Sequence, residues 1–182
     1  AEKWYVSEVG SFNGSSSYIT VPDFAIWNSI TVSVWFKDWS WNWGMLIAKN
    51  TTAEHSFYIN IDNTYLWGVL NFSTTNTSST NYDHIFSMWS WAWTDWNNHN
   101  ITCIYESWVS NRIYFDWVLK STLAVTLWLK DTTNAINIWR REATWSNIYY
   151  NWTIWLTKIY NRALTQSEIQ NLYLEWQRRF WD

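Results

Sequence analysis

Carboxylates, histidines and one cysteine are the residues of this 182-residue chain that could carry out chemistry. Retaining glycoside hydrolysis needs two carboxylates about 5–5.5 Å apart, which alternate residues of one strand can provide. The acidic residues instead stand singly, from Glu8 and Asp23 to Glu168 and Glu175, and no Glu-x-Asp-x-Glu run occurs. The sequence therefore argues against a glycosidase, and only a carboxylate pair brought together by folding would revive that reading.

Metal or nucleophilic chemistry has equally little support. The three histidines, His55, His84 and His99, are isolated and lack metal-site spacing with Cys103. Cys103 lies inside an apolar strand pattern, which predicts a buried structural thiol, and a single cysteine cannot form an internal disulfide. His99 is interpreted as a packing residue at a strand end rather than as a base.

Length and charge narrow the class of protein. The chain has the size of one domain, which we assign to residues 1–182. A formal charge of −3 argues against a nucleic-acid partner, which needs clustered lysine and arginine. No apolar run approaches the roughly 20 residues of a membrane span. The N-terminus, Ala1-Glu2-Lys3, shows no signal-peptide core.

Tryptophan is abnormally frequent, with 20 copies against 4 glycines, although glycine makes up roughly 7% of a typical chain. Many tryptophans follow a turn-forming residue, as in Asp38-Trp39, Asn42-Trp43, Asp95-Trp96, Asp116-Trp117, Asn151-Trp152, Ser40-Trp41, Ser90-Trp91 and Ser107-Trp108. Two-residue hairpin turns favour Asx-Gly because both positions need positive φ, which strains a bulky side chain. These tryptophans therefore stand where glycine is expected, most clearly at Trp117 between two strand patterns.

The C-terminal segment repeats this pattern at the end of a helix. Thr165 and Glu168 have the spacing of a capping box, and apolar residues at helical spacing follow them. The spacing predicts a helix over 166–175, with Trp176 at the left-handed position where glycine usually ends a helix.

Two hypotheses explain the tryptophans. In the first, most stand for glycine in the natural protein, because some bacterial lineages read UGA as glycine and a translation table reading it as tryptophan would print Trp. Trp35, inside an alternating strand pattern, is the clearest genuine aromatic, whereas Trp27, Trp67 and Trp155 stay undecided. In the second, the tryptophans are genuine and form an aromatic surface that stacks on a ligand.

Short strand patterns with turn signals between them organise the whole chain and predict an all-β sandwich or barrel. We expect strands at residues 18–22, 30–37, 45–48, 57–61, 65–72, 100–106, 112–116, 118–123, 135–138 and 153–160. Ile30, Val32, Val34 and Phe36 should share one buried face. The polar segment 73–81 is predicted to be an exposed loop, and a second loop is expected at 87–97.

Five motifs, in order, resemble laminin-G-like domains of the concanavalin A-like group. They are Phe12-Asn13-Gly14 through Ile19, Ile30 through Lys37, His99 through Glu106 with Tyr114 through Leu119, Ile136 through Trp139, and Tyr160 through Tyr173. The resemblance spans nearly the whole chain. It implies a two-sheet antiparallel jelly-roll sandwich with one short C-terminal helix, used for carbohydrate or protein binding outside the cell. Trp117, Trp139 and Trp152 fall where this family carries glycine.

The same resemblance raises the question of calcium. Asp62-Asn63 is similar to the Asp-Asn that related pentraxins use as calcium ligands, and Ca²⁺ prefers such oxygen donors. The second, acidic half of that site corresponds here to Arg140-Arg141-Glu142, so the paired-ion site is not expected. Two readings stay open: an ordinary turn at Asp62-Asn63, or one calcium ion held by Asp62, Asn63 and Glu142.

The sequence thus predicts a non-catalytic recognition module that binds a glycan or mediates adhesion, extracellular or at the cell surface. The competing class is a protein–protein adhesion or structural module with an extracellular protein partner. Ligand contacts are expected at the sheet face or the loop ends. The candidate residues, besides the loop at 73–97, are Tyr58, Tyr65, Tyr149 and Tyr150.

Overall fold

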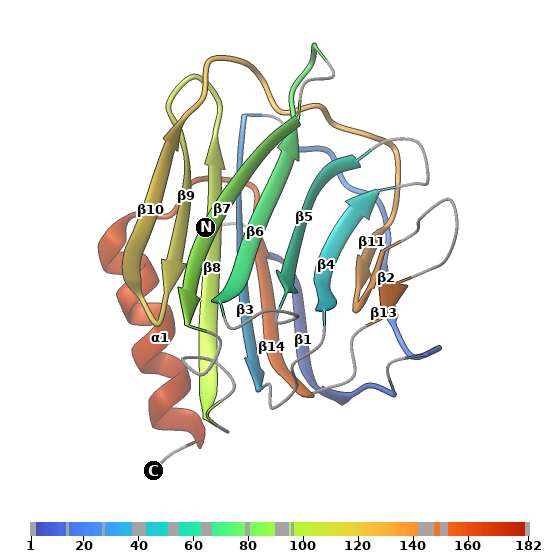
Figure 1. Ribbon diagram of the computed structural model, residues 1–182, viewed down its shortest axis with the longest axis vertical. Coiled ribbons are helices and arrows are strands. Elements are labelled where there is room, and N and C mark those ends of the chain that lie inside the picture. The colour runs from blue at the N-terminus through green and yellow to red at the C-terminus, as the bar shows by residue number, and fades with distance from the viewer. Residues whose placement is uncertain are drawn as a thin grey trace.

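The computed structural model describes residues 3–13, 15–26, 28–37, 43–50, 55–62, 67–78, 81–89, 95, 97–141, 148–149 and 153–180. Two antiparallel sheets lie face to face, and one helix covers the outer side of one of them (Figure 1). This architecture confirms the two-sheet sandwich with a C-terminal helix. Within the described residues, no helix has the length and apolar character needed to cross a membrane.

Each large sheet has six strands. The first, sheet A, has the spatial order β1 (Lys3–Ser11), β14 (Thr153–Tyr160), β3 (Ser29–Lys37), β8 (Asn98–Glu106), β9 (Ser110–Phe115) and β10 (Val118–Ala124). The second, sheet B, has the order β2 (Ile19–Val21), β11 (Ile136–Ile138), β4 (Trp43–Asn50), β5 (His55–Asp62), β6 (Trp67–Thr75) and β7 (Asn81–Trp89). A short pair, β12 (Arg140–Arg141) and β13 (Ile148–Tyr149), lies beyond the end of β11.

The core lies between the sheets and follows the alternation of the sequence. Ile30, Val32, Val34 and Phe36 of β3 are all buried in one cluster, as predicted. Cys103 of β8 belongs to the same cluster, and burial raises the pKa of its thiol well above the usual range. The prediction of a buried structural thiol is therefore confirmed.

The helix α1 (Gln166–Phe180) begins as predicted but ends later. Its capping box is formed, because Thr165 N–H donates to Glu168 Oε2 at 2.9 Å and Glu168 N–H donates to Thr165 Oγ1 at 3.3 Å. Trp176 does not end the helix. Its ring is buried against Trp35, with centroids 4.0 Å apart, so packing on sheet A overrides the expected stop and the predicted end is wrong.

Two predicted loops contain strands instead. β6 continues through Ser73, Thr74 and Thr75, all of which are buried. It lies between β5 and β7, and strand pairing on both sides supplies partners for its backbone groups. The segment 81–89 forms β7, and β1 was not predicted at all. The loop prediction was therefore wrong where neighbouring strands supply hydrogen bonds to the backbone, because it relied on the polar composition of the segment.

Strained tryptophans occur at three turns. Among the described residues, the non-glycine positions with positive φ are Trp108 (65°), Asp116 (47°), Trp117 (61°) and Trp139 (77°). Trp108 and Trp117, at a Ser-Trp and an Asp-Trp turn, are also exposed. Trp139 is strained but buried, and its ring stacks on Phe12 at 4.3 Å. Trp152 lies outside the described residues.

Candidate functional site

A polar hollow of 350 Å³ lies at the edge of sheet B, beside β2, β11 and the end of β4, which are at the right of Figure 1. We call it the edge hollow. Its described lining residues are Tyr18, Thr20, Asn50, Thr133, Asn134, Ala135, Asn137 and Arg140. Arg140 is the one charged residue of this set, and the others offer an aromatic ring, amides and hydroxyls. Such convergent polar groups in a concave surface are typical of a small-ligand site.

The rim of the edge hollow is an aromatic–cation pair. The guanidinium carbon of Arg140 lies 4.5 Å from the centroid of the Tyr18 ring, within cation–π range. Tyr18 is 41% exposed, so its ring is accessible at the surface. Arg140 reaches this position because Trp139, at positive φ, separates β11 from β12 while its N–H donates to Leu46 O at 3.1 Å.

The floor of the edge hollow carries neutral polar groups. The β2–β11 register places Thr20 opposite Asn137, and Thr20 Oγ1 donates to Asn137 Oδ1 at 3.2 Å. Amide side chains offer two donors and one acceptor, and hydroxyls offer both. Together with the Tyr18 face, this set matches a sugar, which presents hydroxyls around its ring and an apolar C–H face.

Ion pairs of the buried Lys49 hold the segments beside the edge hollow. Lys49 is fully buried, and its Nζ lies 2.8 Å from Asp23 Oδ1, 2.5 Å from Asp131 Oδ1 and 3.0 Å from Phe24 O. Asp131 Oδ2 also accepts the N–H of Ile26 at 3.0 Å. We call these residues the Lys49 cluster. It joins β4 to the segments around 23–26 and 131, which are close in sequence to Thr20 and Thr133 of the edge hollow.

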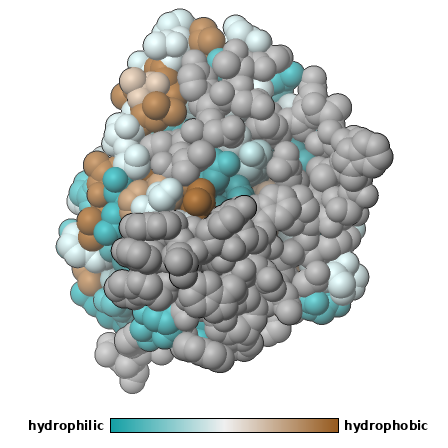
Figure 2. All heavy atoms as spheres, viewed as in Figure 1, coloured by the Kyte–Doolittle hydropathy of each residue, from teal (hydrophilic) through white to brown (hydrophobic). Residues whose placement is uncertain are grey.

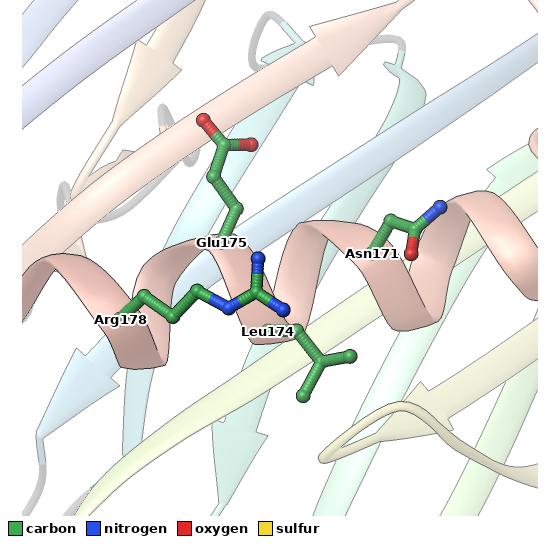
Figure 3. A pocket seen from close by; sticks show the side chains of 4 residues that line it. All are labelled: Asn171, Leu174, Glu175 and Arg178. Carbon is green, nitrogen blue, oxygen red and sulfur yellow. The ribbon is translucent and has the colours of Figure 1, made fainter.

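A larger hollow along α1 is less suited to a ligand. It has a volume of 500 Å³ and is lined by Asn171, Leu174, Glu175 and Arg178, all on a single helix. Figure 3 shows the Glu175 carboxylate and the Leu174 side chain pointing to opposite sides of the helix. The Glu175 carboxylate already accepts a hydrogen bond from Lys158 Nζ at 3.1 Å.

His99 of β8 is a buried polar side chain close to the β9–β10 turn. Its Nδ1 and Nε2 lie 2.9 Å from Asp116 Oδ2 and Asp95 Oδ1, and its ring stacks on Phe115. We call this group the His99 clasp. Burial lowers the pKa of His99, but the hydrogen bonds and charges of Asp116 and Asp95 outweigh burial and raise it overall. A neutral imidazole has one N–H, so donating to both carboxylates requires imidazolium.

This arrangement favours the protonated form of His99, and both of its ring nitrogens lie within hydrogen-bond distance of carboxylates. The prediction of a packing residue captured the burial of His99 but not its two ion pairs. Within the described part of the chain, no group of three or more His, Cys, Asp or Glu side chains could hold a metal ion.

The residues predicted to bind a ligand are only partly placed. Tyr58 lies on β5, where it is 9% exposed and packs in a cluster with Met45 and Ala48. Tyr149 lies on β13, and its backbone pairs with Arg140 of the edge hollow. Asp62 ends β5, but its side chain, like that of Tyr149, is not described. The remaining candidates lie outside the described residues: Tyr65, Tyr150, Asn63 and Glu142.

Sequence reasoning missed the two rim residues. It included Tyr18 only in a predicted strand and a family motif, and Arg140 only as a cation where calcium ligands would be needed. No local pattern joins them, because Tyr18 precedes β2 and Arg140 lies on β12, far away in the sequence. The available signal was an arginine two residues after the strand at 136–138, and only the fold shows that it lies beside Tyr18.

Comparison with known proteins shows structures of similar fold but identifies no sequence family. No protein-family model matches the chain, and no curated protein matches its sequence. A structure of the Ruminococcus gnavus IT-sialidase CBM40 bound to alpha2,3 sialyllactose is similar, with a TM-score of 0.71 and 11% identity over 94% of this chain and 100% of that one.

Toxin binding domains have the same fold in part of their length. The binding domain of botulinum neurotoxin DC in complex with rat synaptotagmin II gives a TM-score of 0.68 and 16% identity, covering 94% of this chain and 46% of that one. A structure of botulinum neurotoxin type C, whose cell entry depends on interaction with two ganglioside molecules, has a TM-score of 0.66 and 16% identity. The match covers 94% of this chain and 46% of that one. This chain thus spans less than half of these toxin chains. The CBM40 and the botulinum neurotoxin DC neighbour are binding domains rather than catalytic ones.

Proposed function

We propose that this chain is a non-catalytic carbohydrate-recognition module and that the edge hollow is its binding site. One observation carries the proposal: Tyr18, Arg140 and several amide side chains meet in one hollow at a sheet edge. An aromatic face can stack on a sugar ring while amides and hydroxyls bond its hydroxyl groups. The Lys49 cluster holds the walls in place, which reduces the entropy lost on binding.

The neighbours support this proposal. One is bound to sialyllactose, and another depends on gangliosides for cell entry. On this likeness we propose that the module acts outside the cell or at its surface. The laminin-G-like resemblance found in the sequence points to the same class of extracellular recognition domain.

Protein binding is the second candidate, because exposed apolar side chains gather on one edge. Figure 2 shows hydrophobic residues along the side of the molecule where β9 and β10 lie. The exposed members there include Val109 (55%), Val118 (42%) and Leu119 (46%). One neighbour is bound to a protein receptor, synaptotagmin II. An apolar edge of this kind fits a protein partner better than a sugar.

A glycan array separates the two functions. We expect the wild-type protein to bind a subset of glycans and Tyr18→Ala to lose that binding, because the stacking face is gone. Leu119→Ala is the matched control, since it truncates a similarly exposed side chain in the other sheet. Binding that survives in Tyr18→Ala, or no glycan bound by the folded wild type, would refute the proposal.

We further propose that most tryptophans, Trp108, Trp117 and Trp139 among them, stand for glycine in the natural protein. Positive φ costs an L-residue roughly 1–2 kcal/mol, and only glycine adopts it freely. Among the described residues, tryptophan occupies three of the four non-glycine positions with positive φ, which supports the substitution. Trp176, helical and buried, gives it no support. Reading the codons decides the question: UGA at the three positions agrees with it, and UGG contradicts it.

A further inference from the structure

We infer that the edge hollow selects sugars that carry an acetamido group and that Asn137 binds the carbonyl oxygen of that group; this inference rests on the proposed function. Asn137 is the central residue of β11, and its neighbours Ile136 and Ile138 are buried in the core between the sheets. Because side chains alternate along a strand, Asn137 lies on the outer face of sheet B. It lines the edge hollow there and is only 5% exposed.

The amide of Asn137 faces Thr20 with its oxygen. Its strand pairs with β2 on one side and with β4 on the other, which places Thr20 and Ala48 beside Asn137 in one row across the sheet (Figure 1). Thr20 Oγ1 donates to Asn137 Oδ1 at 3.2 Å, whereas the Ala48 side chain has no polar group. The amide oxygen is therefore bonded within the protein, and the two Nδ2 donors have no hydrogen-bond partner among the described residues.

A buried amide nitrogen that lines a hollow favours a ligand with an acceptor at that place. A buried donor that lacks a partner costs free energy, and a ligand oxygen that accepts from it removes this cost. A sugar hydroxyl both donates and accepts, so it binds amide oxygens and amide nitrogens alike. A carbonyl oxygen only accepts, and an acetamido substituent is a common carbonyl group on a sugar. The Nδ2 donors of Asn137 therefore favour sugars with this substituent over sugars that present hydroxyls alone.

Other lining residues suit the rest of an acetamido group. Asn134 lines the same hollow, and its side-chain oxygen can accept the acetamido N–H. Ala135 is half-buried and offers a methyl group that the acetyl methyl can contact. Arg140 is already engaged by the Tyr18 ring and by a further contact, so selection is assigned to Asn137.

Two pairs of disaccharides whose members differ only in acetamido groups test this assignment on the full chain. The pairs are N-acetyllactosamine with lactose and N,N′-diacetylchitobiose with cellobiose, each titrated by NMR so that weak binding is also measured. We expect the wild type to bind the acetamido member of at least one pair about tenfold or more tightly. The side-chain N–H signals of Asn137 should shift more with that member than with its hydroxyl counterpart.

Variants then assign the preference to one side chain. Asn137→Asp keeps the shape of the side chain and the oxygen that faces Thr20 but replaces the Nδ2 donors by an oxygen. The ratio of the two affinities in the preferred pair should fall about tenfold or more, whereas damage to the fold would weaken both members together. Thr20→Val lets the amide turn over and should lower the ratio by a smaller factor. Asn171→Asp, the same change on the exposed side of α1, is the matched control and should keep the wild-type ratio.

The possible failures are distinguishable. Equal affinity within both pairs, or a ratio that Asn137→Asp leaves unchanged, would overturn this inference while glycan binding itself stands. Binding to none of the four sugars would also overturn it, whichever glycans the array identifies. A folded wild type that binds no glycan at all would overturn the proposed function as well.

Discussion

Replacing Lys49 by methionine should destabilise the protein by about 3 kcal/mol. The change removes the ammonium group but keeps most of the apolar stem. Asp23, Asp131 and the carbonyl of Phe24 then lose a buried partner that lies 2.5–3.0 Å away. Removing one member of a buried ion pair costs about 3–5 kcal/mol. The two carboxylates are 38% and 32% exposed and can regain some water, so we expect the lower end.

Urea unfolding followed by tryptophan fluorescence measures this loss directly. For a chain of this length, 3 kcal/mol corresponds to a fall in Tm of roughly 6–12 °C. Lys120→Met is the matched control, because Lys120 is exposed on β10 and its loss should cost less than about 0.5 kcal/mol. Adding Asp131→Asn to Lys49→Met should recover part of the stability, since one uncompensated carboxylate is removed.

Two results would refute this reasoning. Lys49→Met could stay within about 1 kcal/mol of the wild type, which would mean that the ion pairs contribute little net energy. Alternatively, the Lys49→Met/Asp131→Asn double variant could be less stable than Lys49→Met, by as much as the loss of another buried contact. That result would rule out an uncompensated carboxylate as the cause of the destabilisation. Either outcome would also remove the argument that the Lys49 cluster prepares the edge hollow for a ligand.

The remaining predictions concern the His99 clasp, a strained turn and calcium. The folded-state pKa of His99 is raised, so its stabilisation is fully present below about pH 6.5 and is lost as pH rises through that higher pKa. Unfolding free energies should therefore differ more between wild type and His99→Gln at pH 6 than at pH 9, and a gap that grows with pH would contradict the clasp. Trp117→Gly should stabilise by about 1 kcal/mol in urea by relieving positive φ, whereas Trp128→Gly, similarly exposed without positive φ, should not. A melting temperature unmoved by calcium would remove the hypothesis of an ion at Asp62, Asn63 and Glu142.

Local patterns predicted most of the strands for a clear reason. Apolar residues alternate along β3, and a strand with period-two alternation can bury one face whatever packs against it. The Thr165–Glu168 capping box likewise marks the start of α1, because its hydrogen bonds lie within one turn of the chain. The strain at Trp117 followed from the turn alone, since the adjoining strands required positive φ there.

Packing decided the features that local patterns missed. The helix α1 extends past Trp176 because the Trp176 ring stacks on Trp35 of β3, which is far away in the sequence. Ser73 and its neighbours form a buried strand because β5 and β7 flank them. In both cases the deciding contact belongs to another element, so propensity within the segment could not reveal it.

The sequence by itself determined which segments alternate apolar and polar residues, which form turns and which cap the helix. Those properties depend on backbone sterics and on hydrogen bonds between residues near each other in the sequence. Only the tertiary structure decided where recognition can occur. Lys49 meets Asp131 across 82 residues, and Arg140 meets Tyr18 across the β2–β11 edge. A binding site depends on groups converging in space, and that convergence exists only once the two sheets have packed and their edges have been joined.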